Sequence, residues 1–117
     1  MQNKPKYSFF KNWKYACDGL ITAIKTENSF KLELFCATFI VALILYVDTT
    51  LTNKLILLVT GILVLIVELL NSAVENMVDL CTKEIHPLAK NAKDLGSTAV
   101  MFTIGLHITC WAFILLF

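Results

Sequence analysis

Three long apolar stretches dominate the chain and predict three helices that cross a membrane. They run over about residues 30–48, 54–79 and 94–117. In the last stretch, His107 is the one side chain from residue 97 onward that can carry a charge near neutral pH. A helix needs ~20 apolar residues to cross the hydrocarbon core, and open strands leave backbone groups unpaired in lipid. We therefore expect an all-α membrane protein in which residues 1–117 form a single domain.

A fourth helix is expected ahead of these spans, over about residues 7–27. Apolar side chains, including Phe9, Phe10 and Trp13, recur at helical spacing on one face, while mainly charged side chains take the other. A helix with this pattern lies in the membrane surface. The residues alone leave open whether it only anchors the chain or also contributes to a site.

Composition supports the membrane setting and excludes several classes of protein. Hydrophobic residues make up 57% of the chain and charged residues 16%, which is incompatible with disorder. The net charge is only +1 and the basic residues are spread out, so no nucleic-acid partner is expected. The four cysteines are isolated and predict packing rather than a metal site.

The distribution of lysine predicts how the chain is oriented. Lysine supplies every basic charge, and only Lys54 lies in the first loop. The others lie before the first span (Lys4, Lys6, Lys11, Lys14, Lys25, Lys31) or in the second loop (Lys83, Lys90, Lys93). The positive-inside rule then places the N-terminus and the second loop in the cytoplasm.

The second span carries acidic residues where lipid disfavours them. At ~100° per residue, Glu68, Glu75 and Asp79 fall on one face of the helix, with Asn71 and Ser72 beside them. A charge near the bilayer centre costs at least ~2.5–3.5 kcal/mol on insertion scales, so the two glutamates need a role or a partner. Asn71 and Ser72 alone would suit hydrogen bonding between helices, and Asp79 alone would suit a solvated helix end.

Paired carboxylates at an aqueous edge are suited to Mg²⁺, which prefers oxygen ligands and usually keeps phosphate oxygens among them. A deeper carboxylate can accept a proton from a hydroxyl that arrives through the lipid. The second loop, KEIHPLAKNAKDLGS, adds Lys93 for phosphate and places Asp94, Gly96 and Ser97 at the expected start of the third span. A simpler interpretation of the loop is a cytoplasmic tether with Asp94 as the N-cap of that helix.

These residues carry a resemblance to a known family. VELLNSAVENMVDL, followed by HPLAKNAKDLGSTAV at the same helix–loop–helix position, resembles the prokaryotic diacylglycerol kinases, and the likeness extends from the amphipathic helix to the C-terminus. It implies a homotrimer in the bacterial cytoplasmic (inner) membrane, with each protomer made of a surface helix and three spans. The implied reaction moves the γ-phosphate of MgATP onto the primary hydroxyl of diacylglycerol in the lipid bilayer.

The resemblance also assigns roles to individual residues. Glu68 becomes the general base, and Glu75 and Glu27 hold Mg²⁺, with Asn71 and Asp79 as supporting residues. The nucleotide is contacted by the metal-binding glutamates and by Tyr15, Glu84, His86, Lys93 and Asp94. The lipid acceptor is contacted by Glu68 and by Glu33, Ser97 and Trp111.

One position departs from the pattern of the family, because Ser8 stands where the proteobacterial enzymes carry arginine. Lys6 or Lys11 is the candidate substitute, although lysine lacks the bidentate fork of arginine. No phosphate-binding G-x-x-x-x-G-K-[ST] loop and no protein-kinase motif is present, so metal and lysine must supply what those loops supply elsewhere.

Three alternatives stay open. Undecaprenol kinases share the NSAxE and AKD elements and also phosphorylate a primary hydroxyl. A small proton-coupled transporter would use Glu68 as its protonation switch, although three spans lack the internal symmetry of such proteins. A purely structural subunit would tolerate Glu68→Gln. His107 and Thr109, in the third span, are expected to pack or to hydrogen bond to neighbouring groups.

Overall fold

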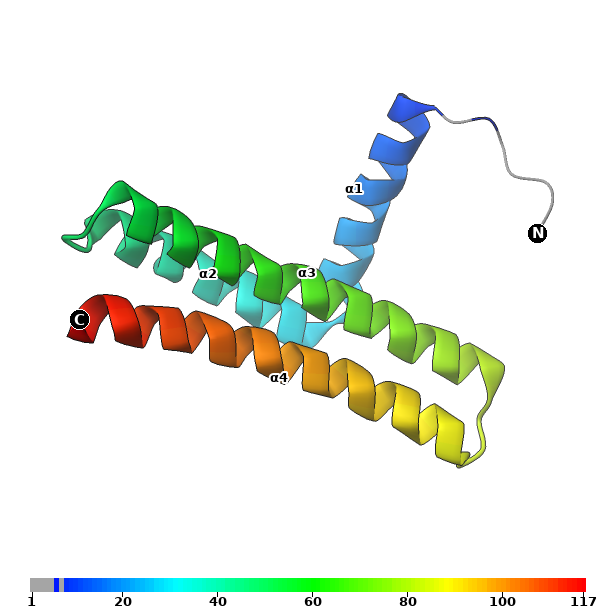
Figure 1. Cartoon of the computed structure of the whole chain (residues 1–117). Coiled ribbons are helices and arrows are strands. Elements are labelled where there is room, and N and C mark those ends of the chain that lie inside the picture. Colours follow the sequence, from blue (N-terminus) through cyan, green and yellow to red (C-terminus); the bar gives the residue numbers. More distant parts are fainter. Residues whose placement is uncertain (1–5, 7) are drawn as a thin grey trace.

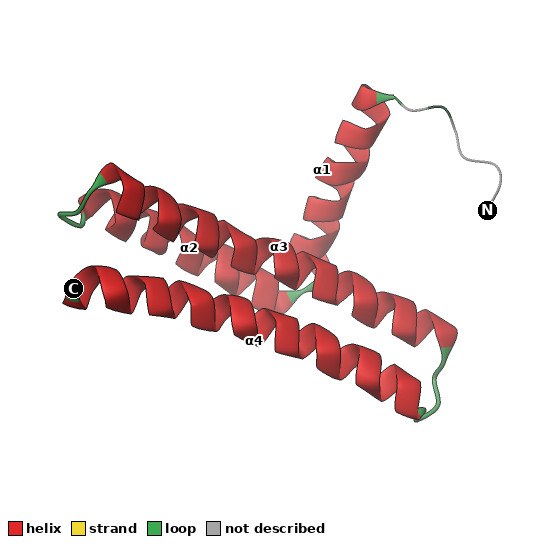
Figure 2. Cartoon of the chain, viewed as in Figure 1, coloured by secondary structure: helices red, strands yellow, loops and turns green. Residues whose placement is uncertain are grey.

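The computed structural model describes residue 6 and residues 8–117, and in this part of the chain every regular element is a helix. The four helices are α1 (Phe9–Thr26), α2 (Asn28–Tyr46), α3 (Leu51–Cys81) and α4 (Pro87–Leu116), joined by short loops (Figures 1 and 2). Helices α2, α3 and α4 are long and apolar enough to cross a membrane. The expected all-α membrane fold with three spans is confirmed, and the chain is a multi-pass membrane protein.

Helix α4 begins earlier than the expected start near residue 94. His86 is its N-cap and accepts a hydrogen bond from the backbone N–H of Leu88 through Nδ1, and Pro87 opens the helix. Proline suits this position because its fixed φ is helical and no N–H is required there. Asp94 therefore lies two turns inside α4, and its interpretation as the N-cap is wrong.

The start of α1 is set by Ser8, whose side chain accepts a hydrogen bond from the backbone N–H of Lys11. A serine at the N-cap satisfies one of the free N–H groups of the first turn. This gives a local structural reason for Ser8 at the position where arginine was anticipated. Residue 7, the expected start of the helix, and Lys4 lie outside the described residues.

The three spans form a bundle in which α3 is the central helix. Helix α4 packs antiparallel along α3, and α2 packs on α3 rather than on α4. Helix α1 contacts α2 and projects away from the bundle (Figure 1). At the end of the bundle formed by the α3–α4 loop, α3 and α4 run on beyond the start of α2 (Figure 1).

Very little of the molecule is buried from its surroundings. The buried apolar side chains are Ala23, Phe30, Ile44 and Leu57, and most large apolar residues of the spans are exposed. Lipid tails are as apolar as these side chains, so association of the helices must rely on close packing and on polar contacts between them.

Two reciprocal glycine contacts set the register of α3 and α4. On α3, Gly61 faces His107 of α4, and a Cβ built on Gly61 would lie 3.2 Å from the ring. On α4, Gly96 faces Asn71 of α3, and a Cβ there would lie only 2.0 Å from Oδ1. Each glycine therefore admits a polar side chain of the other helix.

His107 is the centre of a buried polar relay. The indole N–H of Trp111 donates to Nε2 of His107 over 3.1 Å, and Nδ1 of His107 lies 2.8 Å from the hydroxyl of Thr60. Because indole can only donate, the ring hydrogen is on Nδ1 and is given to Thr60, whose own hydroxyl donates to the carbonyl of Ile56. The expectation that His107 hydrogen bonds to a neighbouring helix is confirmed. Thr109 bonds the carbonyl of Gly105 on its own helix.

Candidate functional site

Glu68 of α3 lies close to Glu33 of α2, near enough for their carboxyl groups to interact. Both residues are half-buried, and Oε2 of Glu33 has no hydrogen-bond partner among the described residues. The pair therefore brings two carboxyl groups, one from each helix, together inside the bundle.

Asn71 lies one turn beyond Glu68 and connects the two halves of the polar face. Its Nδ2 donates to Oε1 of Glu75 over 3.2 Å, and its Oδ1 is buried against Gly96 without a hydrogen-bond partner in the described chain. Gly96 thus decides how Asn71 is oriented, and Asn71 in turn holds the carboxylate of Glu75. The role of Asn71 as a brace remains a prediction, and its contact with Glu75 is compatible with that role.

Glu27 and Glu75 lie at similar heights in the bundle. Glu27 caps the start of α2, six residues from Glu33, and Glu75 lies seven residues from Glu68. At ~1.5 Å per residue, Glu27 stands about 9 Å and Glu75 about 10.5 Å from the Glu33–Glu68 pair, toward the same end. The described part of a single chain holds no group of three or more metal-ligating residues, so these two carboxylates are level but do not form a closed cluster.

Lys93 of α4 reaches back to the acidic face of α3. Its Nζ donates to Oδ1 of Asp79 over 2.7 Å, and Glu75 is close enough to attract its charge. One turn before it, Lys90 forms an ion pair with Asp94 along α4. Lys90, Asp94 and Asp79 are more than half exposed and Lys93 is 43% exposed, so both ammonium groups can exchange a carboxylate for another anion.

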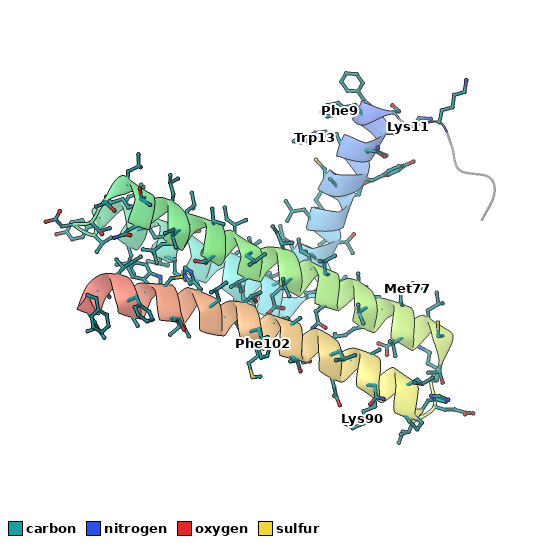
Figure 3. The ribbon with its side chains drawn as sticks, in the orientation of Figure 1. Phe9, Lys11, Trp13, Met77, Lys90 and Phe102 are labelled. Atoms are coloured by element: carbon teal, nitrogen blue, oxygen red, sulfur yellow. The ribbon has the colours of Figure 1, made fainter. Side chains whose placement is uncertain are left out.

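A pocket of about 410 Å³ opens beside the α3–α4 loop. Glu84, His86, Lys93 and Asp94 line it, together with Asp79 and two further lysines, Lys83 and Lys90. Figure 3 shows Lys90 at this end of the bundle. The structure thus gathers four of the predicted nucleotide residues in one place. Lys83 and Lys90 were assigned no role in the site from the sequence, although their positions in the loop and in the first turn of α4 were a usable signal.

Tyr15, Trp111 and Ser97 lie outside this pocket, as do Asn71 and the glutamates described before the pocket. Tyr15 lies exposed on α1, the helix whose Phe9 and Trp13 stand far from the bundle (Figure 3). Trp111 lies 18 residues beyond Lys93 on α4, or about 27 Å along the helix, and it bonds His107 instead. Ser97 is exposed on α4 directly after Gly96.

The donor set at Glu27 and Glu75 fits a hard divalent cation. Both offer carboxylate oxygens, and Asn71 orients Glu75 as an outer-shell partner does. Two carboxylates are also the usual protein share of a Mg²⁺ site that phosphate completes.

Comparison with known proteins decides the family. The family model for prokaryotic diacylglycerol kinase matches residues 14–115. The chain belongs to this family. It is 36% identical to the diacylglycerol kinase of Haemophilus influenzae over 89% of this chain and 88% of that protein. It is also 35% identical to the Pseudomonas aeruginosa diacylglycerol kinase over 87% and 83% of the two chains, and 38% identical to that of Helicobacter pylori J99 over 90% and 79%.

Membership of the diacylglycerol kinase family confirms the resemblance drawn from VELLNSAVENMVDL and HPLAKNAKDLGSTAV. The matched region contains the Glu33–Glu68 pair, Glu75 and the loop pocket. The polar face of α3 therefore lies in the part of the chain that the prokaryotic diacylglycerol kinases share.

Proposed function

We propose that this protein transfers the γ-phosphate of MgATP to the primary hydroxyl of diacylglycerol and forms phosphatidic acid. The proposal rests on one observation. The carboxyl groups suited to a lipid hydroxyl and the groups suited to a nucleotide lie at different levels along α3. Glu68 on α3 and Glu33 on α2 lie deep in the bundle, whereas the cationic pocket and Glu75 lie about 10 Å or more toward the α3–α4 loop. A lipid hydroxyl and a soluble nucleotide would reach such a site from opposite directions.

The position of α1 suggests where the membrane surface lies. A surface helix marks the level of the headgroups, and α1 joins α2 at Glu27. Glu75 lies at the same level as Glu27 and is then at the membrane surface. Asp79 and the pocket lie outside the membrane, on the side of the α3–α4 loop. Glu68 lies about 10 Å below, at a depth that the hydroxyl of a membrane lipid can reach.

In the proposed mechanism, Glu68 accepts the proton of the lipid hydroxyl as its oxygen attacks the γ-phosphorus atom. Glu33 lies beside Glu68 and would contact the acceptor at this point. Lys93 leaves Asp79 for the phosphates and stabilises the charge that develops on them, as phosphoryl transfer requires. Lys83, Lys90 and His86 hold the remainder of the nucleotide in the pocket.

Mg²⁺ would be held by Glu75 and Glu27, and when bound it would neutralise charge on the ATP phosphates. Asn71 keeps Glu75 turned toward this position. The fold does not require a glycine-rich phosphate loop, because positioning and charge account for most of the catalysis of phosphoryl transfer.

The proposal extends to assembly and location. A homotrimer in the bacterial inner membrane, with the N-terminus and the α3–α4 loop in the cytoplasm, would bring both ATP and the lysine-rich end of the bundle into one compartment. A second protomer would also supply acidic groups that the single chain lacks around Glu75. Molar mass by light scattering in detergent, and labelling of single cysteines in intact vesicles, test these two statements.

The test of the function is transfer of labelled phosphate from ATP to lipid by the purified protein in mixed micelles. Diacylglycerol and undecaprenol are offered in parallel, with and without Mg²⁺. We expect transfer to diacylglycerol that Glu68→Gln lowers at least ~100-fold, the usual contribution of a general base, while nucleotide binding persists. Asp48→Asn, at the opposite end of the bundle, is the matched control and should retain activity.

Three outcomes would contradict the proposal. Preferential labelling of undecaprenol would replace the acceptor while leaving the mechanism in place. Undiminished transfer by Glu68→Gln would remove Glu68 from the role of base, and a complete lack of lipid labelling by the wild-type protein would favour the transporter or structural alternatives.

A further inference from the structure

The three lysines of the loop pocket follow one another along the axis of the bundle. Lys90 lies in the first turn of α4, Lys93 lies one turn later, and Lys83 lies in the loop, two residues after the end of α3. At ~1.5 Å per residue, Lys93 and Lys90 are separated by about 4.5 Å along α4. The ammonium groups therefore form a row from the level of Asp79, which Lys93 contacts, to the end of the bundle.

Two of these three ammonium groups are paired with carboxylates of the chain. Nζ of Lys93 donates to Oδ1 of Asp79 over 2.7 Å, and Lys90 pairs with Asp94. Lys83 takes part in neither pair, nor in any other ion pair of the described residues, although it is close enough to Asp79 for the two charges to interact. Lys83 can therefore bind an anion without first releasing a carboxylate.

The backbone around Lys83 is held by hydrogen bonds on both sides of it. The backbone N–H of Thr82 donates to the carbonyl of Val78 over 3.0 Å, and the hydroxyl of Thr82 accepts from the backbone N–H of Glu84 over 3.1 Å. A threonine that bonds the residue two positions later forms a compact turn. Lys83 is the middle residue of that turn, so its side chain starts from a defined place beside the end of α3.

The start of α4 adds to the attraction for an anion. The N–H groups of a first helical turn carry partial positive charge, which acidic side chains usually offset. Helix α4 has no acidic residue in its first turn and carries Lys90 there instead. The N-cap His86 accepts the N–H of Leu88 at Nδ1, so the hydrogen of its neutral ring is on Nε2 and can be donated.

The lysines of α1 are not placed to do the same within one protomer. Helix α1 packs on α2, and Lys11, a candidate from the sequence, lies at the outer end of α1, far from Lys90 (Figure 3). The loop and α4 therefore supply the positive charges of the pocket.

We propose that Lys83 and Lys90 set the direction of the nucleotide, with the γ-phosphate at Lys93 and the β- and α-phosphates at Lys90 and Lys83. The inference rests on the proposed function, because transfer requires the γ-phosphate at the end of the row that is nearer to Glu68. The nucleoside then lies at the loop, where the side chain of Ile85 is fully exposed. Lys83 and Lys90 bind and orient the donor and take no part in proton transfer.

The test measures the binding of MgATP and of MgADP to the purified protein in detergent micelles by titration calorimetry. Lys83→Met and Lys90→Met each remove one charge and keep most of the side chain. Because ADP lacks only the γ-phosphate, each variant should weaken both nucleotides by the same factor, about two- to fivefold as for an exposed ion pair. Lys93→Met should weaken MgATP more than MgADP. Lys54→Met, at the opposite end of the bundle, is the matched control and should bind both like the wild-type protein.

The ratio of the two affinities decides the order of the phosphates. Equal losses for both nucleotides in Lys83→Met and Lys90→Met, with a larger loss for MgATP in Lys93→Met, support the proposal. A loss in Lys90→Met that is larger for MgATP than for MgADP would reverse the direction of the nucleotide and overturn it. Unchanged binding in both variants, together with weaker binding in Lys11→Met, would overturn it by assigning the phosphates to α1.

Arginine variants separate the charge from the structure of the loop. Lys83→Arg and Lys90→Arg keep the charge and should bind both nucleotides nearly as the wild-type protein does. Losses as large as those of the methionine variants would show that the lysines only support the loop, which would overturn the proposal. The titrations need no lipid, so a wild-type protein that binds both nucleotides but labels no lipid would refute the proposed function separately.

Discussion

Gly96→Ala is the most informative single change in the polar face of α3. A Cβ at this position would lie 2.0 Å from Oδ1 and 3.1 Å from Cγ of Asn71, well inside contact distance. Asn71 must then rotate away, and its hydrogen bond to Glu75 is lost. Overpacking of this kind costs about 1–3 kcal/mol, and the lost hydrogen bond costs about 0.5–1.5 kcal/mol. The gain in helix propensity offsets up to ~1 kcal/mol, so we expect the free energy of unfolding to fall by about 2 kcal/mol.

The same helix supplies the control. Gly105 has no atom within 4 Å of a built Cβ, so Gly105→Ala should be neutral or stabilising by up to ~1 kcal/mol, the gain in helix propensity. Unfolding in detergent micelles and phosphate transfer are measured for both variants. Gly96→Ala should also lose activity, because Glu75 is no longer held in place.

A double variant separates the steric effect from the chemical one. Combining Gly96→Ala with Asn71→Ala removes the clash, so the two stability effects should not add, while activity stays low because nothing holds Glu75. If Gly96→Ala were as stable and active as Gly105→Ala, Asn71 would not be seated against Gly96, and the proposed orientation of Glu75 would fail.

Three further predictions follow from other contacts. Asp79→Asn releases Lys93 and should lower the KM for MgATP about two- to fivefold, the range expected when an exposed ion pair no longer competes with phosphate; an increase in this KM would mean that Asp79 positions Lys93 instead. Trp111→Phe removes the N–H that bonds His107 and should cost about 1 kcal/mol in unfolding free energy, an effect that should be absent when His107 is already alanine. Lys54→Met removes the ammonium group that bonds the carbonyl of Leu45 at the end of α2 and should lower stability by about 0.5–1 kcal/mol without changing kcat, while a fall in kcat would contradict its purely structural role.

The fold was predictable to the extent that it depends on hydropathy. The three spans follow from the length of their apolar stretches, and α1 follows from its two-sided pattern. The predicted start of α4 was wrong because the segment KNAKD, residues 90–94, is too charged for a membrane span. Its charge was therefore taken as a sign of a loop. The segment is helical because α3 and α4 continue past the start of α2, where charged side chains can be solvated.

The site was predictable along one helix and not between helices. Helical geometry places Glu68, Glu75 and Asp79 on one face, but it cannot tell that Glu33 stands opposite Glu68 or that Gly96 receives Asn71. Those pairs depend on the register of antiparallel helices, and packing at Gly61 and Gly96 determines that register for α3 and α4. Likewise, a polar role was predictable for His107, whereas its partners Thr60 and Trp111 were not.

The unequal lengths of the helices have a consequence for how two unlike reactants meet. Helix α2 has 19 residues, while α3 and α4 have 31 and 30, so the longer pair forms a ledge above the level at which α2 and α1 join. On the proposed function, the water-soluble nucleotide binds on that ledge without entering the hydrocarbon of the membrane. The lipid acceptor reaches the site laterally and stays within the membrane. Removing whole helical turns from α3 and α4 at this end would separate the two reactants, although the nucleotide would remain in water and the lipid in the membrane.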